Sequence, residues 1–218
     1  MKNQTYFITG ISTEVGKTIV SAIVTQALQA DYWKPVQAGE LEHSDTHKVQ
    51  QLVSNTKTKF HASAFNLKTP MSPHAAAKID GVGLSVTKIK RPKSQNNLVI
   101  EGAGGLLVPL NYKGDTILDL IKYYDAEVVL VCTNYLGSIN HTLLSVDALK
   151  KRNIPIVGIL YIGDENSTTE SIIEKCTNVP VLGRIPIAEE LNKSFVQGQA
   201  ELINQSGILK KGLKEIYE

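Results

Sequence analysis

The sequence contains little cysteine and has no long apolar run. Two cysteines, Cys132 and Cys176, occur among 218 residues, which is too few for a disulfide framework. Cys132 lies within an apolar segment, and we expect it to be a small buried side chain. No segment approaches the ~18 apolar residues of a membrane span, and no Cys/His cluster has the spacing of a zinc site. These absences argue against a disulfide-stapled, membrane-spanning or zinc-stabilised protein.

Positive and negative charges are nearly balanced. Lys and Arg number 23 and Asp and Glu 21, which gives a formal net charge of +2. The longest basic cluster, Lys150 to Arg152, is typical of a solvated helix end. We therefore expect no nucleic-acid partner and no membrane contact. Because Met1 to Gly10 lacks the apolar core of a signal peptide, we also expect a cytoplasmic location.

Short apolar segments alternate with amphipathic ones along the chain. The expected strands are Thr5–Gly10, Tyr32–Val36, Leu98–Glu101, Glu127–Thr133, Pro155–Ile162 and Val179–Leu182. The expected helices are Lys17–Ala30, Asp45–Ser54 capped by Ser44, Ala75–Ile79, Thr116–Tyr124 capped by Asp115, Ile139–Arg152 and Ser167–Cys176, with a helical remainder after Leu182. This order predicts one α/β domain over residues 1–218, a P-loop NTPase-like fold whose mostly parallel sheet has helices on both faces. The layout of residues 60–90 stays open.

The first expected strand leads into a phosphate-binding loop. The segment Gly10-Ile-Ser-Thr-Glu-Val-Gly-Lys-Thr18 runs directly into a helix, which is the context that a P-loop requires. Its first glycine lies one residue earlier than in the usual spelling, where Ile11 stands here. Loop amides cradle phosphate oxygens, Lys17 brings positive charge to the outer phosphates, and the Thr18 hydroxyl is a ligand for Mg²⁺. The sequence therefore predicts ATP or GTP binding.

Three further charged residues follow expected strands. Glu101 ends a strand and precedes four small residues, which suits the second acid that P-loop proteins use for Mg²⁺. Asp45 begins a helix, and by itself it reads as an acid favoured by the helix dipole. Lys34 ends a strand before Pro35. There it suits a transferring phosphoryl group, although composition alone favours an exposed surface charge.

Five segments occur in a fixed order along the chain. They are Gly10-Ile-Ser-Thr-Glu-Val-Gly-Lys-Thr18, Trp33-Lys-Pro-Val-Gln37, Ser72-Pro-His74, Glu101-Gly-Ala-Gly-Gly105 and Leu136-Gly-Ser-Ile-Asn-His141. Together they resemble the dethiobiotin synthetase family, whose P-loop also has the early glycine. The resemblance covers nearly the whole chain and is weakest after about Ala188.

The resemblance implies an ATP-dependent ring closure in biotin synthesis. One amine of 7,8-diaminopelargonic acid takes up CO₂ as a carbamate, and ATP phosphorylates the carbamate to a mixed anhydride. The second amine then closes the ureido ring of dethiobiotin, with release of ADP and phosphate. The resemblance also implies Mg²⁺ as cofactor and a homodimer with the substrate site at its interface.

The family pattern assigns a role to each matching residue. By resemblance, the catalytic residues are Lys34, Lys17 and Thr13, and the Mg²⁺ ligands are Thr18, Asp45 and Glu101. The ATP-binding residues are Glu14, Val15, Gly16, Lys17, Thr18, Ile19, Asp45, Glu101, Gly102, Ala103, Gly104 and Pro186. The substrate-binding residues are Thr13, Lys34, Ala38, Gly104, Gly137, Ser138 and Asn140. His74 is expected to shape its loop.

Two departures from the family pattern affect binding. The family commonly has Ser or Thr where Ala38 stands, so a hydroxyl contact with the substrate is missing. It often has an Asn that reads the adenine, where this chain has Ile162. We therefore predict weak base selectivity, or base recognition by backbone groups near Arg184 to Pro186.

Three other functions remain as alternatives. A partition-type ATPase switch carries a second lysine at the position of Ser12. A cobyrinate-type synthetase needs a nucleophilic cysteine for its glutaminase domain, and neither Cys132 nor Cys176 has that context. A non-catalytic binding protein descended from the enzyme is disfavoured by the intact set of charged residues.

Overall fold

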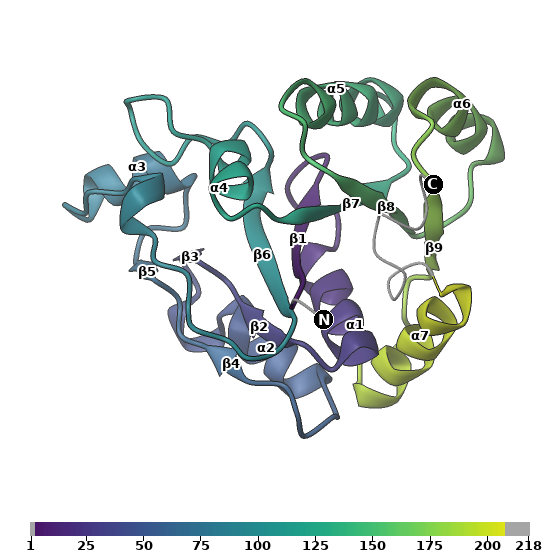
Figure 1. Ribbon diagram of the computed structural model, residues 1–218, viewed down its shortest axis with the longest axis horizontal. Helices are drawn as coiled ribbons and strands as arrows, with labels where there is room; N and C mark the ends of the chain where they lie inside the picture. The colour runs from purple at the N-terminus through teal and green to yellow at the C-terminus, as the bar shows by residue number, and fades with distance from the viewer. Residues whose placement is uncertain (1–2, 208–218) are drawn as a thin grey trace.

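A seven-stranded parallel sheet forms the centre of the computed structural model, which describes residues 3–207 (Figure 1). Its strands are β1 (Thr5–Gly10), β2 (Asp31–Trp33), β4 (Phe60–His61), β6 (Leu98–Gly105), β7 (Glu127–Thr133), β8 (Ile156–Ile162) and β9 (Val181–Ile185). They lie in the order β4-β2-β6-β1-β7-β8-β9, and every neighbouring pair is parallel. β3 (Val36–Ala38) and β5 (Phe65–Leu67) form a separate two-stranded parallel sheet.

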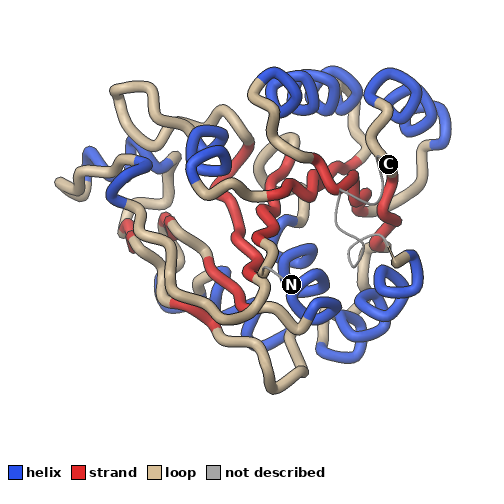
Figure 2. Tube along the Cα trace, in the orientation of Figure 1, coloured by secondary structure: helices blue, strands red, loops and turns tan. Residues whose placement is uncertain are grey.

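Helices cover both faces of the large sheet. They are α1 (Lys17–Leu28), α2 (Asp45–Leu52), α3 (Pro73–Ile79), α4 (Ile117–Tyr123), α5 (Ser138–Lys151), α6 (Ser167–Thr177) and α7 (Lys193–Ser206). Figures 1 and 2 show α1, α2 and α7 on one side and α4, α5 and α6 on the other, with α3 near the β3–β5 pair. None of the helices described is long and apolar enough to cross a bilayer. The α/β architecture expected from the sequence is confirmed.

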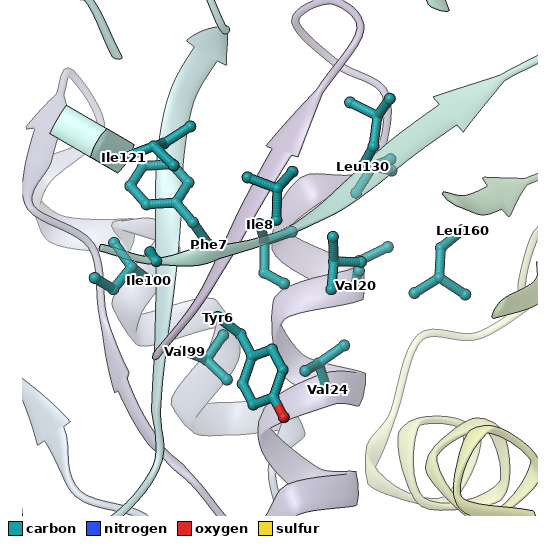
Figure 3. Packing of buried hydrophobic residues seen from close by; sticks show 14 of the residues in the cluster. Tyr6, Phe7, Ile8, Val20, Val24, Val99, Ile100, Ile121, Leu130 and Leu160 are labelled. Atoms are coloured by element: carbon teal, nitrogen blue, oxygen red, sulfur yellow. The ribbon is translucent and has the colours of Figure 1, made fainter. Parts of the chain in front are cut away.

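Burial on both faces explains why the central strands are apolar throughout. All six residues of β1 are buried. Figure 3 shows Tyr6 and Val99 beside Val24 of α1, whereas Phe7 lies toward Ile121 of α4. Successive side chains of a strand point to opposite faces, so neither face of β1 can be polar. The expected burial of the Cys132 thiol is also confirmed, and burial raises its pKa to about 12.

The expected strand over Tyr32–Val36 is wrong in one respect, because it is two strands in two different sheets. β2 ends at Trp33 and β3 begins at Val36. Pro35 has no N–H to donate to a ladder, and its carbonyl accepts from the Phe65 amide at 3.1 Å. The chain therefore leaves the large sheet at Lys34. This places the Lys34 side chain at the carboxyl ends of the strands, where ligands bind in such sheets.

Other expectations need smaller corrections. Ser44 caps α2 as predicted, but Thr116, not Asp115, caps α4 through a capping box with Asp119. Asp115 instead accepts hydrogen bonds from the Val86 amide and the Asn111 side chain. The last strand lies over Val181–Ile185, so the remainder is helical only from Lys193 to Ser206, and positions beyond 207 lie outside the described residues. The open stretch 60–90 holds β4, β5, α3 and a 3₁₀ turn over Val86–Lys88.

Asp31 joins β2 to its neighbours through a buried carboxylate. One oxygen accepts from Ser94 Oγ at 2.8 Å and lies 3.1 Å from His61 Nε2, and the other accepts from the Lys59 amide at 3.1 Å. Burial alone would raise the pKa of Asp31, but these hydrogen bonds outweigh it and lower the pKa. The ionised carboxylate of Asp31 therefore stabilises the folded chain.

Asp31→Asn should lower the free energy of unfolding by about 2 kcal/mol near neutral pH. A depressed pKa contributes stability that is present above the unfolded value and is lost as the pH falls through the folded one. The difference between variant and wild type should therefore shrink below about pH 4, which urea unfolding at two pH values measures. Asp147→Asn, at a more exposed carboxylate, is the matched control. If Asp31→Asn lowered the free energy of unfolding by the same amount at both pH values, this account would be contradicted.

Candidate active site

The P-loop wraps the carboxyl end of β1 and starts α1. The Ile11 amide donates to the Val131 carbonyl at 3.1 Å, which ties the loop to β7. Gly16 caps α1 with a φ of 87°, and a Cβ at this position would lie 3.1 Å from Ile162 Cδ1. Glycine is therefore required here both for the left-handed backbone and for the close approach of β8. The backbone amides at the start of α1 point into the space beyond the carboxyl ends of the strands.

A cavity of about 520 Å³ opens where the P-loop, β6 and α2 meet. Its lining residues are Thr13, Glu14, Gly16, Lys17, Thr18, Ile19, Lys34, Asp45, Lys48, Gln51, Leu52, Glu101, Gly104 and Leu191. Their side chains include three lysines and three carboxylates. A concave site that gathers opposite charges in this way suits a phosphorylated ligand held together with a cation.

Lys34 lies between two carboxylates inside this cavity. Its ammonium donates to Glu101 Oε1 at 2.9 Å and to Asp45 Oδ2. The residue is only 6% exposed, so the composition-based interpretation of Lys34 as a surface charge is wrong. Burial works against the charged amine, but Glu101 and Asp45 outweigh it and raise the pKa of Lys34. In turn, Lys34 overcomes the effect of burial on Asp45 and lowers the pKa of that carboxyl.

The pKa of Lys17 is shifted in the opposite direction to that of Lys34. Its ammonium donates to the Ser12 carbonyl at 3.0 Å. Burial is the main cause that lowers its pKa to about 8, and the positive charge of Lys34 adds to this effect. Glu101 and Asp45 offset the shift only in part. The site therefore holds a lysine whose charge is poorly compensated, and an anionic ligand is what would compensate it.

The oxygen donors around Thr18 fit a magnesium ion. The Thr18 hydroxyl donates to Glu101 Oε1 at 2.8 Å. Asp45 is linked to Glu101 because both carboxylates accept a hydrogen bond from the Lys34 ammonium. Mg²⁺ is commonly held by one or two carboxylates together with phosphate oxygens rather than by a full protein cage. Over residues 3–207 no three His, Cys, Asp or Glu side chains form a metal-binding group. A metal here would consequently need the ligand's phosphates to complete its coordination.

Most of the predicted site residues line this one cavity, but eight do not. Those that line it are Thr13, Glu14, Gly16, Lys17, Thr18, Ile19, Lys34, Asp45, Glu101 and Gly104. Those that do not are Val15, Ala38, Gly102, Ala103, Gly137, Ser138, Asn140 and Pro186. Val15 is buried beneath the loop, and the Gly137–Asn140 segment starts α5. The roles of all the predicted site residues, in the cavity or outside it, stay predictions.

Four lining residues were not predicted from the sequence: Lys48, Gln51, Leu52 and Leu191. Lys48 and Leu52 lie three and seven positions after Asp45 on α2, which places them on the same helix face. That helical spacing is a signal that could have found them. Leu191 lies in the segment before α7, and no spacing in the sequence links it to the P-loop.

His74 lies in the first turn of α3 and contacts both the preceding loop and the segment before α4. Its Nδ1 lies 3.1 Å from Ser72 Oγ, its amide donates to the Pro109 carbonyl, and its ring packs edge-on against Tyr112. It does not line the cavity. These contacts support the expected loop-shaping role.

A parallel sheet with a phosphate loop after its first strand, and acids facing that loop, defines a P-loop nucleotide-binding protein. Solved structures agree with this class. A plasmid partition protein from Borrelia burgdorferi bound to AMPPNP superposes with a TM-score of 0.61 at 16% identity, covering 96% of this chain and 100% of that one. The cell division ATPase MinD of Pyrococcus furiosus gives a TM-score of 0.55 at 14% identity, covering 94% and 100%. At these identities the likeness is one of fold alone.

Sequence comparisons identify the family more narrowly. A family model described as an AAA domain matches residues 4–194. The ATP-dependent dethiobiotin synthetase BioD of Christiangramia forsetii is 58% identical over 91% of this chain and 95% of that protein. The enzyme of the same name from Cytophaga hutchinsonii is 50% identical over 89% and 94%. The chain belongs to the dethiobiotin synthetase family.

Proposed function

We propose that this chain is an ATP-dependent dethiobiotin synthetase, active as one catalytic domain over residues 1–218. It joins CO₂ to 7,8-diaminopelargonic acid and closes the ureido ring, with ATP as co-substrate and Mg²⁺ as cofactor. The observation that carries the proposal is the position of Lys34, buried between Asp45 and Glu101 in the cavity that also holds the P-loop lysine. The names of the similar enzymes give dethiobiotin as the product. The diamine substrate comes from the resemblance of the sequence to that family.

The chemistry needs positive charge at a group that gains negative charge. One substrate amine adds to CO₂ and loses a proton, which gives a carbamate. A carbamate oxygen then takes the γ-phosphoryl group of ATP, and ADP leaves. The second amine attacks the carbonyl carbon of this anhydride, the carbon–oxygen bond to phosphate breaks, and the ring closes with loss of a proton. Phosphate leaves with the bonding electron pair, so atoms and charges balance.

The cavity supplies two lysines with different tasks. Lys17, at the start of α1, holds the outer phosphates together with the loop amides. Lys34 directly follows β2 and lines the same cavity, and its charge stabilises the carbamate and the transferring phosphoryl group. Mg²⁺ neutralises phosphate charge when it is bound, and Thr18, Asp45 and Glu101 would hold it. Thr13 lines the cavity from the loop, which supports a contact with the γ-phosphate or the substrate amines.

A homodimer is part of the proposal. The Gly137–Asn140 segment at the start of α5 is the expected contact for the substrate's carboxylate tail, and it does not line the cavity of its own chain. Leu136 beside it is fully exposed, and Leu144 on α5 is 58% exposed. An exposed apolar surface next to a predicted substrate contact supports a shared site across two copies of the chain.

Leu136→Asp should convert the dimer to a monomer and raise the KM of the diamine at least ~10-fold, because a charge would have to be buried at the interface. Analytical ultracentrifugation and initial rates measure the two effects. Lys122→Asp, at an exposed position of α4, is the control. A wild-type chain that sediments as a monomer and still turns over the diamine would contradict a shared site.

Two rival functions receive less support. The partition and MinD-type neighbours share the fold at under 25% identity, and Ser12 stands where a partition-type switch carries its extra lysine. A cobyrinate-type glutaminase needs a reactive cysteine, whereas Cys132 is buried with a raised pKa. We also propose a cytoplasmic location, with which two free cysteines agree.

The proposal is tested by the dependence of ATP hydrolysis on the diamine. Phosphate release with Mg²⁺ and bicarbonate should rise at least ~100-fold when 7,8-diaminopelargonic acid is added, because the γ-phosphoryl acceptor is the carbamate. Phosphate release at the same rate without the diamine would be the activity of a P-loop ATPase and would contradict the synthetase function.

Weak discrimination between ATP and GTP is a further expected result. Ile162 occupies the position of the adenine-reading Asn and contacts Gly16 with a side chain that neither donates nor accepts. The ratio of kcat/KM for ATP and GTP should therefore stay within about 10-fold, since no buried polar group is left unpaired by the wrong base. Steady-state rates with both nucleotides measure this. A preference for ATP of about 1,000-fold would show that backbone groups near Arg184 or another residue read the base.

A further inference from the structure

Tyr32 makes a buried contact with one of the site acids. Its side chain is fully buried on β2, and its hydroxyl donates to Glu101 Oε2 at 2.8 Å. The other oxygen, Oε1, accepts from Thr18 at 2.8 Å and from Lys34 at 2.9 Å. The two oxygens of Glu101 therefore have separate partners, and only Oε1 faces the P-loop.

The register of the parallel sheet explains this contact. Tyr32 pairs with Val99 in β6, and Val99 pairs with Tyr6 in β1. Figure 3 shows Tyr6 and Val99 on the side of α1. Side chains alternate along a strand, so Glu101, two residues after Val99, points to the same face one step nearer the P-loop. The Tyr32 side chain is long enough for its hydroxyl to reach the Glu101 carboxylate in this next row of side chains.

The contact restricts how the carboxylate can turn. Glu101 is 1% exposed, so a carboxylate oxygen that lost the Tyr32 hydroxyl would have no water to replace it. The Tyr32 side chain is itself fully buried, so water does not compete for its hydrogen bond to Glu101.

We propose that Tyr32 is a positioning residue that fixes the Glu101 carboxylate with Oε1 toward the metal and Oε2 toward the sheet. This inference rests on the proposed function, because it takes Glu101 as a ligand of Mg²⁺. Tyr32 itself does not line the cavity, so we expect it to touch neither nucleotide nor substrate. Its contribution is to the orientation of the metal ligand.

Mn²⁺ binding to the ADP complex of the full chain tests the inference. Free Mn²⁺ is measured by electron paramagnetic resonance, with wild type and Tyr32→Phe at saturating ADP. Tyr32→Phe should weaken Mn²⁺ binding by roughly 10-fold, the size of effect typical when a partner of a metal ligand is removed. Binding of ADP without metal should stay within about twofold, because the P-loop amides are unchanged.

The matched control is Tyr124→Phe. Its hydroxyl is also buried and donates at 2.5 Å to the Ile89 carbonyl, away from the cavity. This variant loses a buried hydrogen bond of the same kind and should leave Mn²⁺ affinity unchanged. Equal weakening by Tyr124→Phe would show a general loss of stability and would overturn the positioning role.

A double-variant cycle separates action through Glu101 from action on the fold. In a Glu101→Gln background, Tyr32→Phe should change Mn²⁺ affinity less than twofold, since the oriented ligand is already gone. The same tenfold loss in that background, or wild-type affinity in Tyr32→Phe alone, would overturn the inference. If the wild-type ADP complex binds no Mn²⁺, the metal site and the inference both fail. Absence of diamine-dependent turnover, with the Mn²⁺ pattern intact, would remove the proposed reaction alone.

Discussion

Lys34→Ala should lower kcat by about 1,000-fold, the upper range for removing one preorganised charge from a transition state. In the proposed mechanism Lys34 is the cation at the transferring phosphoryl group, while Lys17 and the loop amides remain for nucleotide binding. The KM for ATP should therefore change by no more than about fivefold. Steady-state kinetics with the diamine measures both constants, and a kcat within tenfold of wild type would refute the role of Lys34.

The same variant should also be less stable, which the position of the residue at a strand end does not suggest. Without Lys34, Asp45 and the buried Glu101 would face each other with no cation between them. Removing one partner of a buried ion pair costs about 3 kcal/mol. Turnover should therefore be measured below the melting temperature of the variant. Lys151→Ala, at an exposed lysine, controls for loss of a charge and should leave both properties unchanged.

Lys17→Met should abolish measurable ATP binding and yet stabilise the protein without ligand. The pKa of Lys17 is lowered from 10.5 to about 8, so keeping the amine charged opposes folding by about 3 kcal/mol near neutral pH. Methionine has a similar length and no charge. The lost hydrogen bond to the Ser12 carbonyl offsets about 1 kcal/mol of the gain. The melting temperature should rise by about 5 °C.

The pH dependence follows from the sign of this shift. A lysine with a lowered folded pKa destabilises the protein below that value, and wild type recovers stability as the pH rises from about 8 toward 10.5. The advantage of Lys17→Met should therefore disappear over the same range. Calorimetry at about pH 7 and about pH 10 compares the two proteins, with Lys151→Met as control. A variant that is less stable than wild type at the lower pH would show that the charge of Lys17 is well compensated.

Local signals made the first part of the fold predictable. The strand, loop and helix from Thr5 to Leu28 are adjacent in the chain, and each carries its own pattern: an apolar run, two glycines and a helical repeat. The break between β2 and β3 has one local signal, Pro35, which cannot donate to a strand ladder, but a proline at a strand end does not say that the chain enters a second sheet. Only the pairing of Val36 with Phe65 shows that the chain changes sheets.

The charged cluster shows where sequence reasoning stops. Asp45 and Glu101 lie 11 and 67 positions after Lys34, so no periodicity relates the three residues. They meet because β2 and β6 are neighbours in the sheet and α2 begins beside them. Asp45 alone reads as a helix-start acid, and Lys34 alone as a surface charge. Glu101 was predicted from its place at the end of an expected strand, whereas the resemblance to a family selected Lys34 and Asp45.

Ring closure on the diamine is the central claim, and isotope transfer tests it most directly. The enzyme is incubated with ATP, Mg²⁺, 7,8-diaminopelargonic acid and ¹³C-labelled bicarbonate, and the products are read by mass spectrometry. We predict dethiobiotin that carries one ¹³C atom in its ureido ring, formed in equal amount with ADP and phosphate. ADP and phosphate without labelled dethiobiotin would contradict the claim.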